Sequence, residues 1–112
     1  MTERDTWGAD PEVRRMRGIF AEIEKAQGDL LQGLKVSPSD YRLRRVREAA
    51  LMLFEKAWMR AQQSGVVGND AEIGILYAYC LARMLEANRI PVAVEFLPRH
   101  DAIARFAKEM VK

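Results

Sequence analysis

Residues 73–85 constrain the fold most strongly, because Arg83 is the only charged residue in this stretch. Asn69 or Asp70 can cap a helix that begins here and runs to about residue 88. Such a helix is apolar on nearly all sides, and a helix of this kind is normally covered by other helices. Gly74 and Ala78 would let those neighbours approach closely. The sequence therefore predicts an all-α fold with this helix at its centre.

Three further helices are expected around the central one. Asp10 followed by Pro11 offers an N-cap acceptor and a proline suited to the first helical position. Capping side chains at residues 37–40 mark the start of another helix, and Gly65 is expected to end it. Residues 98–101 introduce a last, amphipathic helix. The expected fold is a small bundle of about four helices, at approximately residues 11–35, 40–63, 70–88 and 99–111.

At 112 residues the chain has the usual size of one domain. We expect a flexible tail at residues 1–9 and a single α-helical domain at 10–112. Residues 90–97 alternate like a strand, whereas Pro91 is equally able to open a short helix. Because a lone strand would have no partner in this chain, we favour irregular structure or a short helix there.

The first helix carries a heptad seam with one polar member. Its apolar positions are spaced alternately by three and four residues, which predicts burial against another helix. The seam consists of Val13, Met16, Phe20, Ile23, Gln27, Leu30 and Leu34. Gln27 is the polar member; it would fix helix register in an assembly if buried, or would lie exposed or pair with backbone.

The charge balance argues against a generic polyanion binder, since 18 Lys and Arg face 16 Asp and Glu. Cys80 is the single cysteine, so no intramolecular disulfide forms and secretion gains no support. No apolar run reaches the roughly 20 residues that span a bilayer. We therefore expect a cytoplasmic protein that does not enter the membrane.

Signals for catalysis and for bound metals or cofactors are weak. His100, the one histidine, stands at a helix start and is interpreted as a capping or exposed residue. Cys80 is interpreted as a small core residue. The clustered ligands of zinc or di-iron sites and the glycine-rich phosphate loops do not occur. No catalytic, metal or cofactor residue is assigned, although an enzyme whose polar groups converge from different helices stays a third possibility.

Arginines cluster near two helix starts, where the helix dipole disfavours cations. On the second helix a basic stripe is spaced to follow one side. The candidate phosphate contacts are Arg14, Arg15, Arg17, Arg42, Arg45, Lys56 and Arg60. They suggest a small nucleic-acid-binding subunit that makes sequence-independent phosphate contacts. The alternative is a solvated surface in which Arg44 pairs with Glu48 one turn on.

Apolar residues on the second helix extend beyond the face that one core requires. The surplus residues are Leu51, Met52, Trp58 and Met59. A second copy of the chain or another protein would cover them, and methionine suits adaptable contacts. The leading hypothesis is therefore a non-enzymatic α-helical interaction module, expected to be a homodimer. Nucleic-acid binding through the arginines is the alternative.

Overall fold

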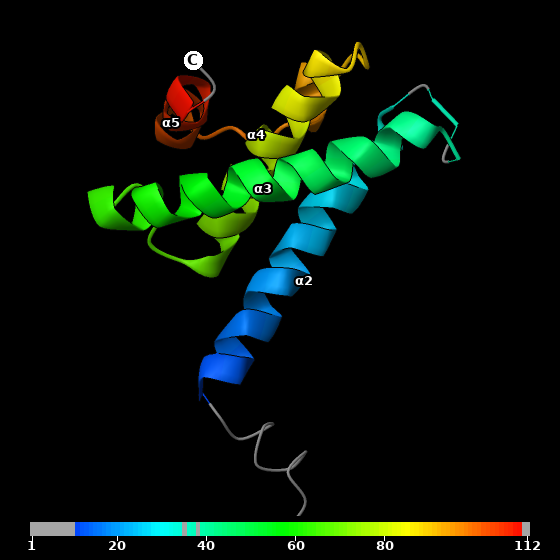
Figure 1. Ribbon diagram of the computed structural model, residues 1–112. Coiled ribbons are helices and arrows are strands. Elements are labelled where there is room, and N and C mark those ends of the chain that lie inside the picture. Colours follow the sequence, from blue (N-terminus) through cyan, green and yellow to red (C-terminus); the bar gives the residue numbers. More distant parts are fainter. Residues whose placement is uncertain (1–10, 35, 38, 111–112) are drawn as a thin grey trace, which may run out of the picture.

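The computed structural model describes residues 11–34, 36–37 and 39–110, and these form four α-helices and one short 3-10 helix (Figure 1). They are α2 (Pro11–Gln32), α3 (Tyr41–Ser64), α4 (Asp70–Ala87), η1 (Val94–Phe96) and α5 (Asp101–Met110). The described part of the chain contains no strand, and the expected all-α fold is confirmed. The expected tail at residues 1–9 and the cap at Asp10 lie outside the described residues.

Helix α4 lies at the centre, because it packs against all three other helices. In Figure 1, α3 lies across α4, while α2 and α5 lie to either side. Side chains of α4 point into each of these contacts and are almost fully buried, among them Ile73, Leu76, Tyr77, Cys80, Leu81 and Leu85. The expectation drawn from the apolar stretch 73–85 is therefore confirmed.

Helices α2 and α4 lie side by side and approach closely. A methyl group added at Gly74 would lie 3.0 Å from Cβ of Glu22, and one at Gly18 would lie 2.7 Å from Oδ2 of Asp70. Further along, the Tyr77 hydroxyl donates a 2.8 Å hydrogen bond to Oε1 of Gln27. These contacts follow one another in the same order on both helices, so α2 and α4 run in the same direction.

Local capping sets the helix ends much as the sequence indicates. Asp40 caps α3 by accepting a 2.9 Å hydrogen bond from the backbone N–H of Arg42. Asn69 caps α4 in the same way through the N–H of Glu72, also at 2.9 Å. Gly65 closes α3 in the left-handed conformation, with φ at 75°. The largest difference from expectation is at α2, which ends at Gln32 rather than near residue 35, directly before Gly33.

The segment between α4 and α5 is irregular apart from η1, as expected for residues 90–97. Ile90 is buried in the core, whereas Val94 is largely exposed. Phe96 packs against the bare face of Gly33, where a methyl group would collide with its ring. Through this contact, the segment that follows α4 packs against the end of α2.

The heptad seam expected to be buried on α2 is only partly so, and this prediction was wrong for two of its members. Met16 is 40% exposed and Phe20 is 57% exposed. The side of α2 that α4 covers carries the seam residues Ile23 and Leu30 together with Ile19, which is not a member of the seam. An α-helix drifts by about 20° per heptad from a strict 3.5-residue repeat, so one straight neighbour does not cover a whole seam.

Candidate interaction surface

Helix α3 is long and amphipathic, and one side of it is buried in the core. The buried residues on that side are Leu43, Val46, Ala50, Phe54, Ala57 and Ala61. They recur at three- and four-residue spacing, as expected for one face of a helix. The opposite side is free of other elements in the part of the chain that the structure describes, so candidate functional groups on α3 lie there and along its edges.

The four residues predicted as an apolar interface form two neighbouring rows on α3. Met52 and Met59 are separated by two helical turns and are 66% and 64% exposed. Leu51 and Trp58 have the same spacing on the next row, where Leu51 is 43% exposed and Trp58 is half-buried. We call these four residues the α3 apolar surface.

Trp58 connects this surface to the core through stacked aromatic rings. Its ring lies parallel to that of Phe54, with centroids 5.7 Å apart. Phe54 in turn meets Tyr77 of α4 edge to face at 5.5 Å. The indole Nε1 of Trp58 is buried and has no hydrogen-bond partner among the described residues. Desolvating a donor without a partner costs about 1–3 kcal/mol, so Trp58 is held here by its apolar contacts.

The basic stripe on α3 is only partly available for phosphate. Arg42 forms two hydrogen bonds to the Asp40 carboxylate, at 2.8 and 3.1 Å, and donates a third, at 3.4 Å, to the carbonyl of Asn88. The Arg42 side chain is therefore occupied in joining the start of α3 to the end of α4. Arg42, one of the candidate phosphate contacts, thus makes three side-chain hydrogen bonds within the protein.

The other cations of the stripe are exposed. Arg45 and Lys56 form no ion pair with any described residue, and Arg60 donates to the sulfur of Met110 at 3.6 Å. Arg44 lies 3.7 Å from Glu48, as the alternative interpretation expected. The first arginine cluster, Arg14, Arg15 and Arg17, lies at the start of α2, while α3 begins near the other end of that helix (Figure 1). The fold does not bring the two clusters together.

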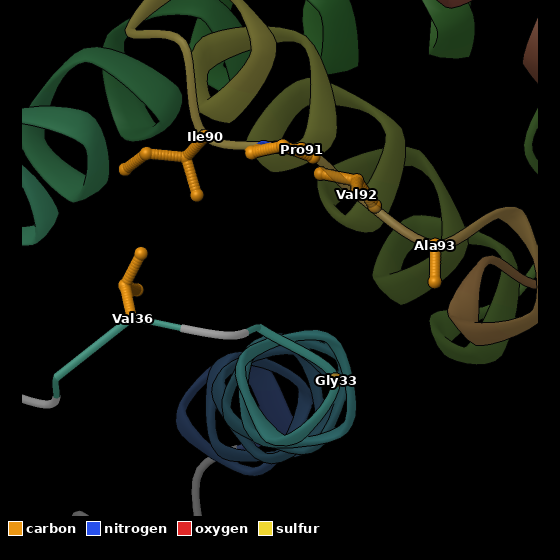
Figure 2. A pocket seen from close by; sticks show the side chains of 6 residues that line it. All are labelled: Gly33, Val36, Ile90, Pro91, Val92 and Ala93. Atoms are coloured by element: carbon orange, nitrogen blue, oxygen red, sulfur yellow. The ribbon is translucent and has the colours of Figure 1, made fainter.

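Several cavities of about 100 to 400 Å³ lie in the surface of the described structure. The most aliphatic one, about 370 Å³, lies between the end of α2 and the segment after α4. Figure 2 shows Ile90 and Val36 pointing toward each other across it, with Pro91, Val92 and Ala93 along one wall. None of its six lining residues is ionisable, so the cavity offers space for an aliphatic group but no acid, base or nucleophile.

His100 and Cys80 occupy the structural positions that the sequence suggested. The Nδ1 of His100 accepts a 3.2 Å hydrogen bond from the N–H of Ile103, which caps α5. Its Nε2 lies 3.1 Å from the Glu72 carboxylate. Cys80 is buried in α4, and burial raises the pKa of its thiol to about 12. The described residues contain no group of three or more His, Cys, Asp or Glu side chains that could hold a metal ion.

Sequence reasoning missed Met16 and Phe20 as exposed apolar residues, because it placed both in a buried seam. The sequence held one indication of their exposure, which is Gly18 between them. A glycine lets a neighbouring helix approach closely, and at Gly18 this neighbour is α4, which lies on another side of α2. That approach leaves the side with Met16 and Phe20 uncovered.

Comparisons with protein-family models, with curated proteins and with solved structures found no match. In the described part of the chain, no helix combines the length and apolar character needed to cross a bilayer.

Proposed function

We propose that this protein is a non-enzymatic α-helical interaction module that associates with a second copy of itself through the α3 apolar surface. The observation that carries the proposal is the exposure of Met52 and Met59 beside Leu51 and Trp58. Burying apolar area contributes about 25 cal/mol per Å², so covering this surface favours association. Methionine side chains adapt their shape to a partner, and Trp is frequent at the centres of interfaces.

The direct test is the molar mass of the protein in solution over a range of concentrations. We expect light scattering to give a dimer that dissociates on dilution. Replacing Met52 and Met59 together by Glu places two charges on the surface without touching the core, so the double variant should be monomeric at concentrations where the wild type is dimeric. Its helical circular dichroism should be unchanged.

Val94→Glu is the matched control, because Val94 is an exposed apolar residue in η1, away from α3. This variant should dimerise as the wild type does. A wild-type protein that stays monomeric at the highest soluble concentration would overturn the proposal. An unchanged dimer in the Met52 and Met59 double variant would move the interface away from the α3 apolar surface.

A second candidate, sequence-independent nucleic-acid binding, is favoured by one observation: Arg45 and Lys56 are exposed and lack ion pairs among the described residues. Arg60 continues the same stripe. If this function holds, labelled DNA or RNA should bind at low salt and be released steeply as salt rises. Replacing Arg45, Lys56 and Arg60 by Gln should weaken that binding, whereas Met52→Glu should leave it nearly unchanged. No binding at low salt would exclude this candidate.

A further inference from the structure

Two cavities adjoin where α2 ends, and together they offer an aliphatic space and one cation. The larger one, about 370 Å³, is the cavity of Figure 2, which Gly, Val, Ile, Pro and Ala residues line. The smaller one, about 100 Å³, lies between the end of α2 and the start of α3 and is lined by four aliphatic residues and Arg47. Val36 lines both, so the two cavities meet at its side chain.

Arg47 is partly buried, and its charge has no counter-ion among the described residues. Its side chain forms no ion pair or hydrogen bond with any of them, and its Nε is buried without a partner. Arg44, three residues earlier, is exposed and lies 3.7 Å from Glu48 instead. Buried polar groups are nearly always hydrogen-bonded and buried charges are paired, so an exception of this kind points to an anion that binds there.

The cavities and the arginine together define the chemistry of a ligand. Small-molecule sites are typically apolar clefts of about 300–1,000 Å³ with a few polar groups that fix orientation, and the larger cavity lies in this range. A planar guanidinium binds a carboxylate through two parallel hydrogen bonds. No acidic residue among those that line the two cavities would repel the carboxylate. The smaller cavity accommodates a compact carboxylate, whereas a phospholipid head group is larger than this space.

We propose that the end of α2 is a binding site for a small aliphatic carboxylate, such as a fatty acid of medium chain length. The chain lies in the larger cavity between Ile90 and Val36, and the carboxylate accepts hydrogen bonds from the Arg47 guanidinium in the smaller one. The site uses no residue of the α3 apolar surface, so this inference does not depend on the proposed self-association.

Octanoate is the probe for the first experiment, a titration of the isotope-labelled protein followed by NMR. We expect saturable shifts at the backbone amides of Gly33, Ile90 and Val92, which line the larger cavity. In the series from butanoate to octanoate, each further methylene that is buried should lower the Kd about fourfold. Octanol has the same chain without the charge, and it should bind the wild type about tenfold more weakly than octanoate.

Three variants separate the cation from the cavity. Arg47→Met keeps a long side chain without the charge, so octanoate should bind about tenfold more weakly and octanol as in the wild type. Arg44→Met, at an exposed arginine of the same helix, is the matched control and should leave octanoate binding unchanged. Ala93→Leu fills part of the larger cavity and should weaken both probes. The helical circular dichroism of each variant should match that of the wild type.

The wild type alone can overturn the proposal, which keeps the test decisive even if a variant does not fold. Absence of saturable shifts with octanoate overturns it, and so do shifts that lie away from the two cavities. Equal affinity of the wild type for octanoate and octanol also overturns it, because the carboxylate then has no anchor. An Arg47→Met variant that binds octanoate as tightly as the wild type has the same consequence.

Discussion

At the scale of single residues, two glycines with open surroundings should respond oppositely to the same substitution. Gly65→Ala places a side chain in a left-handed conformation, with φ at 75°, and should destabilise the protein by about 1–2 kcal/mol. Gly28→Ala, at an exposed position in the last two turns of α2 with no atom near the added methyl group, should stabilise it by about 0.5–1 kcal/mol. Urea unfolding of both variants measures the difference. A stabilising Gly65→Ala would show that the α3 end does not need its left-handed residue.

Cys80 gives a second prediction at this scale. Since burial raises the pKa of its thiol to about 12, the group stays neutral at neutral and mildly alkaline pH. The thiolate is the reactive form, so a disulfide reagent should label Cys80 in the folded protein only at the rate of unfolding. In denaturant the same thiol should react within the mixing time. Fast labelling of the folded protein at pH 8 would contradict the buried position of Cys80.

At the scale of elements, the start of α3 should carry a pH-dependent part of the stability. Hydrogen bonds from the Arg42 guanidinium, then from the Arg42 backbone N–H, lower the pKa of the Asp40 carboxyl from its ordinary value. A carboxyl whose pKa is lowered on folding stabilises the folded state above its unfolded pKa of about 3.9, and this contribution is lost as the pH falls through the folded pKa.

Asp40→Asn isolates that effect, because Asn keeps an acceptor for the N-cap and loses the charge. The wild type should be the more stable protein at pH 7, and its advantage should shrink below about pH 4. Chemical unfolding at several pH values measures the difference. Glu48→Gln, at an exposed pair 3.7 Å from Arg44, serves as the control and should change little at any pH. An advantage of the wild type that is the same at pH 3 and pH 7 would rule out the charge as its cause.

At the scale of the whole molecule, the helices should differ in how readily they open. Helix α5 is 10 residues long, and its buried residues are Ile103 and Ala107. Helix α4 is surrounded by the other three helices. Because short helices depend on packing, backbone amides of α5 should exchange hydrogen through an opening that costs less free energy than the opening of α4. Hydrogen exchange followed by mass spectrometry gives both values. Equal values would mean that the four helices unfold as one unit.

The local features of this fold could be predicted from the sequence because they depend on neighbours in the chain. Asn69 begins α4 and Gly65 ends α3 through contacts within a few residues, and the apolar stretch 73–85 must be covered by other helices whichever these are. The exposure of Met52 and Met59 also follows from their place on the side of α3 opposite its buried face. These predictions rested on helical spacing and capping alone.

Only the tertiary structure decided which apolar helix faces are buried and which polar side chains form hydrogen bonds with distant segments. Met16 and Phe20 stay exposed because α4 packs against another side of α2, and the spacing within α2 does not encode which of its sides a neighbour covers. Arg42 is held by Asp40 and by Asn88, which lies 46 residues further along the chain. The sequence by itself thus determined an all-α fold with α4 at the centre. Packing between distant segments decided its exposed surfaces, because coverage depends on where helices cross.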